Sequence, residues 1–339
     1  MTSGPQILIV DSQFDRSIDK FPRQRAAWEA LGATVTLAEC TTEEEIIAAG
    51  RDADILVYLG LYTPLTENVL SQLPKCQLIA RFGIGMDSVD MEAATSQGIV
   101  VANAAEYCVP EVADHATGLI LSLARRITML DRFVRSGNWG GAVEHVGPMP
   151  RLSTQAVGLV GFGRIARHVA HNLVNIMGEL LAYDPYVSQA QADAYRVRMV
   201  SLDELLAQSD YVSVHTPLMP QTRGLIGARQ LELMKPTAYL VNTSRGPVVD
   251  EAALIAALQA KQIAGAGLDV FDPEPLDEDS LLRSMDNVIL TPHMAAYSLQ
   301  AIEDLHTAVT ATVSDVLQGF LPRHVMNASV KPRGGLRRR

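Results

Sequence analysis

The chain has 339 residues, of which 48% are hydrophobic and 19% are charged, and its formal net charge is −10. This composition is typical of a globular protein with enough apolar material for two domains, and no low-complexity tract occurs. The last nine residues, 331–339, carry five positive charges and no acid, so the rest of the chain carries −15. That balance argues against nucleic acid as a partner of the folded body, and the basic tail is expected to be disordered.

Membrane and metal partners are disfavoured as well. No stretch of about 18 apolar residues occurs, and the first ten residues lack the charged region and cleavage site of a signal peptide. The cysteines, Cys40, Cys76 and Cys108, are scattered and follow no metal-binding or redox spacing. We therefore expect reduced thiols, no metal site, no membrane contact and a location in the cytoplasm.

In the first third of the chain, short apolar segments alternate with helical patterns. The predicted strands are 6–10, 34–38, 55–58, 78–80 and 99–102, with helices near 24–31, 42–49, 67–73 and 91–96. Strands separated by single helices predict right-handed βαβ units and a parallel sheet. Because no glycine-rich loop follows the first strand, this part is not the nucleotide-binding one.

The remaining chain predicts a second unit of the same type. A long helix over 112–135 is followed by strands at 156–160, 180–183, 211–215, 239–241, 265–269 and 288–290, and by a last helix at 299–317. The fold class is therefore α/β, with two Rossmann- or flavodoxin-like, doubly wound parallel sheets. We expect a nucleotide domain at 106–298, inserted into a discontinuous substrate domain formed by 1–105 and 299–330.

A glycine-rich loop marks the nucleotide site. The apolar run 156–160 leads into Gly161-x-Gly163-x-x-Ala166 and then into a helical pattern. Glycines there permit a tight turn and close approach of a pyrophosphate to the helix N-terminus, so the candidate contacts are Gly161, Phe162, Gly163, Arg164 and Ile165. Asp184 follows the next strand, 18 residues beyond Ala166, where an acid accepts from a ribose hydroxyl and repels a 2′-phosphate. NAD is therefore the predicted cofactor; the alternative is an ordinary Asp-Pro turn.

Three further strands end in polar segments, where ligands of open α/β sheets bind. Arg245 follows 239–241, a segment with several acids follows 265–268, and His293 follows 288–290. Reduction of a 2-keto acid requires an anchor for the carboxylate, a proton donor near neutral pH and an acid that orients it. Taken singly, an arginine or a histidine in such a place is more often structural.

With these motifs, the chain resembles the D-isomer-specific 2-hydroxyacid dehydrogenases over nearly its whole length. The matching segments are the glycine loop, 241–246 (VNTSRG), 267–275 (GLDVFDPEP) and 291–293 (TPH). The resemblance implies that Arg245 binds substrate, Glu274 orients His293, and His293 is the acid/base. It also implies that Asp269 holds the nicotinamide carboxamide and that further residues lie along the cofactor, namely Thr216, Pro217, Thr222, Thr243 and Ser244. His215 is interpreted as a structural residue.

The resemblance also assigns a substrate loop in the first domain, with Arg81, Gly83 and Ile84 as candidate residues. Backbone N–H groups around Gly83 and Ile84 are expected to hold the substrate carboxylate opposite Arg245. The same residues also suit a simple strand-to-helix turn.

Segment 107–115 (YCVPEVADH) is similar to the branch that includes C-terminal-binding proteins and some phosphoglycerate dehydrogenases. Ala296 stands where that branch usually has tryptophan, which leaves open the identity of the 2-hydroxy acid and the physiological direction. Glu274 disfavours a formate dehydrogenase, because that branch typically has glutamine at this position. Ile84 disfavours a phosphite-oxidising relative, which typically has lysine there. The alternative from another class is an NAD(H)-sensing binding protein similar to the corepressors of this branch. A homodimer is expected through the 112–135 helix and its surroundings.

Overall fold

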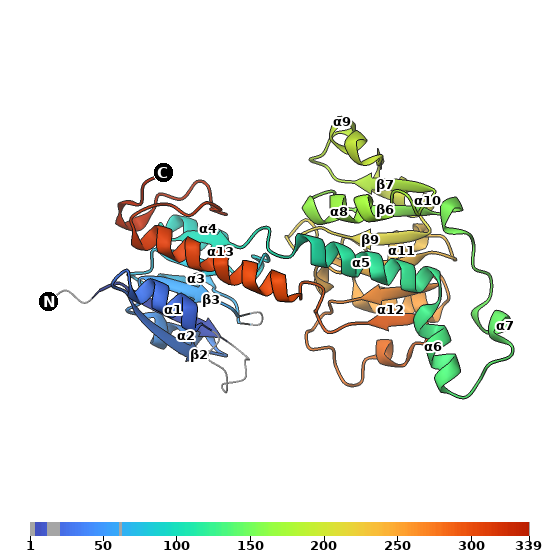
Figure 1. Cartoon of the computed structure of the whole chain (residues 1–339), viewed down its shortest axis with the longest axis horizontal. Helices are drawn as coiled ribbons and strands as arrows, with labels where there is room; N and C mark the ends of the chain where they lie inside the picture. The colour runs from blue at the N-terminus through green and yellow to red at the C-terminus, as the bar shows by residue number, and fades with distance from the viewer. Residues whose placement is uncertain (1–3, 12–20, 61–62, 339) are drawn as a thin grey trace. The chain divides into compact units, whose positions relative to one another are not determined.

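The computed structural model describes residues 4–11, 21–60 and 63–338 (Figure 1). The chain divides into two compact units, which we call unit 1 (Met1–Tyr107 with Ser298–Arg339) and unit 2 (Cys108–Tyr297). The predicted domain boundaries, after residues 105 and 298, lie within two residues of these divisions. None of the described helices is both long enough and apolar enough to cross a bilayer.

Unit 1 contains a five-stranded sheet in which all neighbouring strands are parallel, as predicted. Its strands are β1 (Gln6–Asp11), β2 (Thr34–Glu39), β3 (Ile55–Tyr58), β4 (Leu78–Arg81) and β5 (Val100–Asn103). The spatial order β2-β1-β3-β4-β5 is that of flavodoxin-like folds. The strands from the middle of the sheet to one edge, β3, β4 and β5, are buried along their whole length. This burial explains why their sequences are largely apolar.

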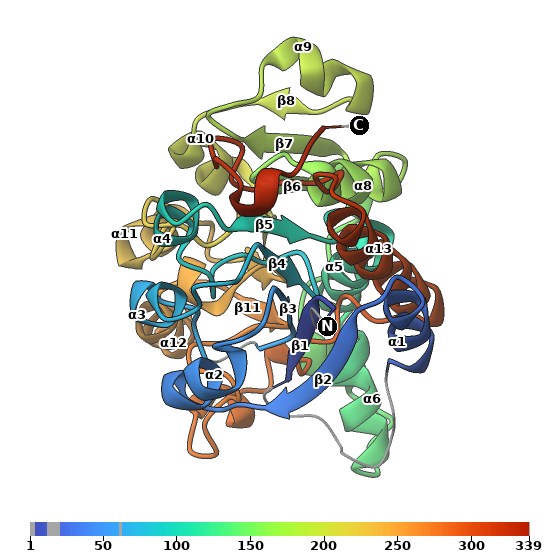
Figure 2. The ribbon, with the colours of Figure 1, turned by 90° about the vertical axis from the view of Figure 1, so that its left-hand side faces the viewer.

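Helices cover both faces of this sheet (Figure 2). One face carries α2 (Glu43–Gly50), α3 (Glu67–Ser71) and α4 (Met91–Ser96), and the other carries α1 (Pro22–Glu29) and α13 (Leu299–Leu317). Ser298 caps α13 by accepting a hydrogen bond from Ala301 N at 2.9 Å. Because Leu305, Val309 and Val313 recur every four residues, one face of α13 is apolar and packs into the core of unit 1. The C-terminal helix thus completes the unit that the N-terminal segment begins.

The basic tail was predicted to be disordered, but Arg333 joins it by hydrogen bonds to the N-terminal part of unit 1. Arg333 N donates to Gly98 O at 2.8 Å, and the Arg333 guanidinium donates to the backbone carbonyls of Leu73 and Pro74 at 3.1 and 3.2 Å. Gly98 has a φ of +71°, and a Cβ there would lie 2.7 Å from Lys331 O, so this glycine permits the close approach. Carbonyl groups at the ends of helices and turns accept these hydrogen bonds. The charge of the tail alone does not predict such acceptors.

Unit 2 contains a seven-stranded parallel sheet. Its strands are β6 (Ala156–Val160), β7 (Glu179–Tyr183), β8 (Arg198–Met199), β9 (Tyr211–Val214), β10 (Tyr239–Asn242), β11 (Gly265–Leu268) and β12 (Val288–Leu290). The order β12-β11-β10-β9-β6-β7-β8 is Rossmann-like, with the topological switch point between β6 and β9. The helices α5 (Val109–Ala124) and α8 (Arg164–Leu173) share one core cluster, and α10 (Leu202–Gln208), α11 (Ala228–Leu233) and α12 (Glu251–Gln259) share the other.

The single helix predicted over 112–135 is wrong. The chain forms α5, turns at Arg126 and continues as α6 (Ile127–Arg135), which a short α7 (Ala142–Val146) follows. Arg126 adopts a left-handed φ of 55°, and its guanidinium lies 4.7 Å from the centre of the Tyr239 ring. The apolar spacing of the sequence continues across this break, so periodicity alone does not reveal it.

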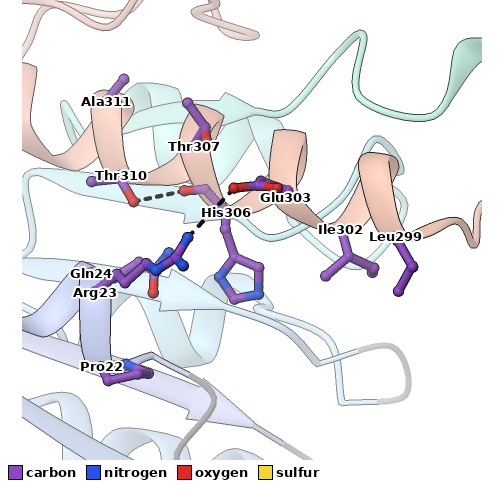
Figure 3. Close-up of a pocket in the computed structure, with 10 residues that line it drawn as sticks. All are labelled: Pro22, Arg23, Gln24, Leu299, Ile302, Glu303, His306, Thr307, Thr310 and Ala311. Carbon is purple, nitrogen blue, oxygen red and sulfur yellow. Dashed lines mark hydrogen bonds and ion pairs between the residues drawn. The ribbon is translucent and has the colours of Figure 1, made fainter.

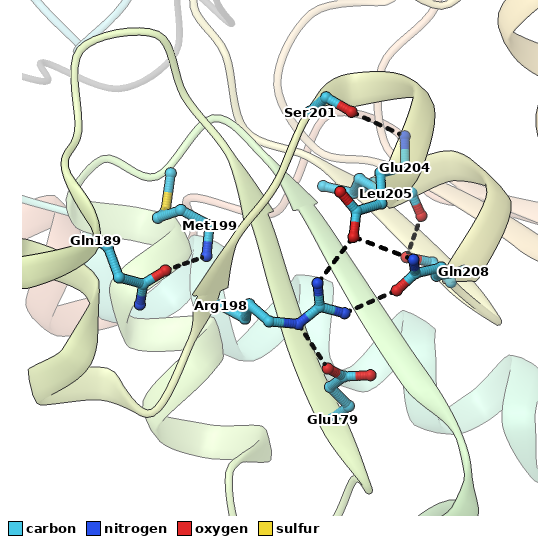
Figure 4. Close-up of polar contacts among 9 residues, drawn as sticks. Glu179, Gln189, Arg198, Met199, Ser201, Glu204, Leu205 and Gln208 are labelled. Carbon is cyan, nitrogen blue, oxygen red and sulfur yellow. Dashed lines mark hydrogen bonds and ion pairs between the residues drawn. The ribbon is translucent and has the colours of Figure 1, made fainter.

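Strand β8 was not predicted, because two residues at a sheet edge show no apolar pattern. The side chain of Arg198 joins it to its neighbours, with hydrogen bonds to Glu179 and Glu204 at 2.9 Å each and to Gln208 at 2.7 Å (Figure 4). Charged side chains of this kind also protect an exposed edge from pairing with another chain.

Candidate active site

The turn from β6 to α8 has the shape that a dinucleotide loop requires. Gly161 has a φ of +88°, and a Cβ there would lie 3.1 Å from His215 O and 2.9 Å from the Thr216 methyl group. Gly163 precedes α8 without a side-chain cap, and a Cβ placed on it would meet nothing within 4 Å. The first glycine is therefore needed by the fold, and the second leaves open space at a helix N-terminus. That space suits a pyrophosphate.

The other predicted residues of this loop differ in their surroundings. The Phe162 side chain is buried in the core against Tyr195, with ring centroids 5.7 Å apart, so only its backbone faces the loop. Arg164 is exposed and Ile165 is half-buried in the first turn of α8. The predicted cofactor contacts of these three residues stay predictions, and for Phe162 they are limited to main-chain atoms.

Asp184, at the end of β7, is fixed by the backbone. Its two carboxylate oxygens accept hydrogen bonds from Phe162 N and Tyr186 N, each at 2.9 Å. These bonds hold the half-buried carboxylate beside the glycine loop. Each oxygen has a further lone pair, so the group retains the capacity to accept from a ribose hydroxyl.

Two threonine hydroxyls at the carboxyl ends of the central strands lack partners. The Oγ1 atoms of Thr216, after β9, and Thr243, after β10, are buried and have no hydrogen bond within the described residues. Buried polar groups are normally satisfied, so these atoms are consistent with a ligand that hydrogen-bonds there. In contrast, Thr222 is engaged by Pro217 O at 2.6 Å, and Ser244 Oγ by the Asn242 side chain at 2.8 Å. The glycine loop, Asp184 and the two free hydroxyls together fit a dinucleotide.

The structure brings Glu274 and His293 into contact. His293 Nδ1 lies 2.7 Å from Glu274 Oε2, and Glu274 Oε1 accepts from Phe271 N at 3.0 Å. Since the carboxylate is an acceptor, Nδ1 carries the proton and Nε2 is the other ring nitrogen, which has no partner among the described residues. The His293 side chain is 30% exposed and that of Glu274 17%. An oriented imidazole with one open nitrogen is suited to proton transfer.

Arg245 stands on a loop that packs against the loop of Glu274. A Cβ on Gly246 would lie 1.8 Å from Phe271 O, so only glycine permits this approach. The Asn242 amide donates to Arg245 O at 2.9 Å, and the Arg245 guanidinium donates to Ser244 O at 2.8 Å. The half-buried Arg245 and the Glu274–His293 pair thus belong to adjoining loops at the same edge of the sheet.

The predicted substrate loop of unit 1 turns its carbonyl groups inward. Arg81, which is 4% exposed, donates to the carbonyls of Phe82 and Gly85 at 3.2 Å each, and the Asn103 amide donates to Ile84 O at 2.7 Å. The N–H groups of Ile84 and Gly85 have no acceptor within the described part of the chain. Arg81 therefore shapes the loop from behind, and its direct contact with a substrate stays a prediction.

Sequence reasoning gave no role to two asparagines that prove important. Asn103 and Asn242 are the last residues of β5 and β10, are buried, and each donates to a backbone carbonyl of a predicted functional loop. The signal in the sequence was an amide residue that ends an apolar strand. The carboxylate of Asp269 is fully buried and accepts hydrogen bonds from Thr291, Met294 and Ala295. Its predicted contact with the nicotinamide stays a prediction.

Unit 1 also has a hollow of about 820 Å³ between α1 and α13 (Figure 3). Arg23 and Glu303 form an ion pair of 3.4 Å across it, and burial together with Arg23 lowers the pKa of His306 on its wall. None of the predicted catalytic or cofactor residues lines this hollow. In the described ranges, no group of three His, Cys, Asp or Glu residues is placed to hold a metal ion.

Comparisons with known proteins identify the family of this chain. The family model for "D-isomer specific 2-hydroxyacid dehydrogenase, NAD binding domain" matches residues 117–295. A glyoxylate reductase of Korarchaeum cryptofilum is 38% identical over 293 residues, which cover 85% of this chain and 87% of that protein. The chain therefore belongs to the D-isomer-specific 2-hydroxyacid dehydrogenase family, and residues 117–295 carry the NAD-binding domain of that family.

The chain is also similar to a longer dehydrogenase and to a solved structure. A D-3-phosphoglycerate dehydrogenase of Synechocystis is 39% identical over 296 residues, covering 87% of this chain and 52% of that protein. The chain thus spans about half the length of the phosphoglycerate dehydrogenases that it matches first. The solved D-lactate dehydrogenase from Aquifex aeolicus, complexed with NAD and lactic acid, is 28% identical, with a TM-score of 0.81 and coverage of 92% of this chain and 96% of that one.

Proposed function

We propose that the chain is an NAD-dependent oxidoreductase that interconverts a small D-2-hydroxy acid and the matching 2-keto acid. The observation that carries this proposal is the 2.7 Å contact between Glu274 and His293, with His293 Nε2 left open at the ligand-binding edge of a nucleotide-binding sheet. The family model and the relatives named glyoxylate reductase and phosphoglycerate dehydrogenase support the reaction class.

The roles follow from the chemistry of each group. NADH, when bound, supplies hydride to the carbon of the substrate carbonyl. The imidazolium form of His293 then gives its Nε2 proton to the carbonyl oxygen, while the Nδ1 proton stays on the ring and remains hydrogen-bonded to Glu274. The Glu274 carboxylate accepts from Nδ1 and so fixes the orientation of the ring. The planar guanidinium of Arg245 binds the substrate carboxylate or carbonyl oxygen.

We also propose that the loop of Gly83 and Ile84 in unit 1 binds the substrate carboxylate. The inward carbonyls and the open N–H groups of Ile84 and Gly85 support this assignment, because such N–H groups bind anions. The Asp184 carboxylate supports NAD over NADP, since it would repel a 2′-phosphate. The cysteines Cys40, Cys76 and Cys108 are buried and not joined in disulfides, which agrees with a reducing, cytoplasmic location.

The experiment that tests the reaction follows NADH oxidation with a panel of 2-keto acids, from glyoxylate to phosphorylated and aromatic members. We expect turnover on at least one member, and a loss of about 10²-fold to 10⁴-fold in His293→Ala with NADH binding retained. Near-normal turnover of this variant would contradict the assignment. NADH binding without turnover on any member would favour the NAD(H)-sensing alternative. The size of the preferred 2-keto acid also indicates how much space the pocket has beside Ala296.

We also propose that two copies of the chain associate through α6 and α7. None of the residues in these two helices is buried, and the segment between and within them exposes large apolar side chains, with Trp139 84% and Val143 77% exposed. Figure 1 shows α6 and α7 extending away from the sheet of unit 2. Clustered exposed apolar groups are typical of an interface, and a second copy is the commonest partner.

A further inference from the structure

A buried set of polar groups lies behind the segment that carries His293. Asp269 follows β11 and is fully buried. Its Oδ1 accepts from Thr291 Oγ1 at 2.6 Å and from Met294 N at 2.9 Å, and its Oδ2 accepts from Ala295 N at 2.9 Å. These donors come from both sides of His293 in the sequence. The carboxylate therefore fixes the course of the backbone on which His293 stands.

His115, on α5, extends this set by one hydrogen bond. Its Nε2 lies 3.0 Å from Thr291 Oγ1 and 3.6 Å from Asp269 Oδ1. The hydroxyl of Thr291 has one proton, and the bond to Asp269 uses it because a carboxylate only accepts. Thr291 therefore accepts from His115, whose proton must be on Nε2. The hydrogen bonds run in one direction, from His115 through Thr291 to Asp269.

The backbone at His293 needs such support. Its φ of 53° is in the left-handed region, which a residue with a side chain adopts only under strain. His293 N donates to Asp269 O at 2.8 Å, so the main chain and the side chain of Asp269 both hold this segment. A weaker hold would let the imidazole move relative to the reacting atoms, and small displacements cost much of the rate.

We propose that His115 and Thr291 are positioning residues that act through Asp269 to keep His293 in its working orientation. Neither residue is assigned a contact with substrate or cofactor. The catalytic role of His293 in this inference rests on the proposed function. The hydrogen bonds that fix the backbone of residues 291–297 do not depend on it.

Matched variants test the proposal in the full chain. His115→Leu removes the donor, whereas His115→Gln places an amide N–H near the position of Nε2. Thr291→Val removes the hydroxyl with little change of shape, and Thr291→Ser keeps it. We expect His115→Leu and Thr291→Val to lower kcat about tenfold or more, with the KM for NADH changed by less than about threefold, and the other two variants to stay within about threefold of the wild type. His171→Leu, an exposed histidine of α8, is the control that leaves kcat unchanged.

Amide hydrogen exchange over residues 291–297 gives a readout that does not need turnover. We expect faster exchange at Met294 and Ala295 in His115→Leu and wild-type exchange in His115→Gln. Wild-type kcat in His115→Leu, or equal losses in the Leu and Gln variants, would overturn the proposal. If the wild type turns over no member of the panel, the proposed function fails. Amide hydrogen exchange then tests by itself whether His115 helps to fix the backbone of residues 291–297. Unchanged exchange in His115→Leu would reject that positioning role.

Discussion

Two histidines follow strands of the same sheet, and their surroundings give them opposite properties. His215, after β9, lies 2.9 Å through Nε2 from Ser213 Oγ, and burial lowers its pKa to about 4, so its ring is neutral at neutral pH. His293, after β12, has only Nδ1 engaged, on a carboxylate. A neutral, bonded ring serves the fold, whereas an open nitrogen opposite a carboxylate is able to carry a proton. We therefore propose His293, and not His215, for the acid–base role.

At the same scale, we propose that Asp184 sets the choice between NAD and NADP. We expect Asp184→Ala to weaken NADH binding and to shift the NADP/NAD preference ratio about tenfold or more toward NADP, because the charge that repels a 2′-phosphate is lost. Asp184→Asn is the matched variant, since it keeps one acceptor oxygen for the Phe162 or Tyr186 N–H group. It should shift the ratio with a smaller loss of NADH affinity. Titration of both cofactors by fluorescence measures this, and an unchanged ratio would reduce Asp184 to a turn residue.

The strand–turn–helix element from β6 to α8 uses two glycines for different reasons. Only glycine suits position 161, because the backbone φ is +88° and an added Cβ would collide with His215 and Thr216. Gly163 has an ordinary φ of −77° and faces open space. A substitution at the first site therefore acts on the fold, and one at the second acts on whatever ligand occupies that space.

A pair of alanine variants separates these effects. We expect Gly161→Ala to lower the free energy of unfolding by about 2 kcal/mol or more, from the left-handed conformation and the contacts it would force. We expect Gly163→Ala to unfold like the wild type while its Kd for NADH rises about tenfold or more, since the new methyl group occupies the pyrophosphate space. Denaturant titration and NADH binding are measured on both. Normal NADH binding by Gly163→Ala would show that the cofactor does not use this turn.

Elements differed in how far the sequence predicted them. The buried parallel strands were predicted well, because strands covered on both faces read as apolar runs. The sequence pattern does not predict the break at Arg126, whose guanidinium contacts Tyr239, a residue more than a hundred positions away. Strand β8 was missed because its support comes from the side chains around Arg198 rather than from any pattern within it.

At the scale of the whole molecule, topology explains why the candidate site was predictable in outline. Parallel strands end at one edge, so residues that follow different strands, such as Arg245 and His293, are brought to the same side of a sheet. The sequence alone does not predict which groups become hydrogen-bonded. The hydrogen bond of the Asn103 amide to Ile84 O joins residues 19 positions apart, and the donors to Asp269 lie 22 to 26 positions from it. The packed tail, held by Arg333, belongs to the same class of contact.

Association is the remaining property of the whole molecule, and α6 with α7 is the surface on which to test it. Replacing Trp139 and Val143 together by serine should convert a dimer to a monomer, or weaken its Kd about a hundredfold, because an interface depends on a few large apolar side chains. Sedimentation equilibrium measures the mass of the wild type and the variant. Leu37→Ser, an exposed apolar residue on β2 of unit 1, is the control and should leave the mass unchanged. A monomeric wild type, or a double variant that remains dimeric, would place the exposed side chains of α6 and α7 outside any self-association surface.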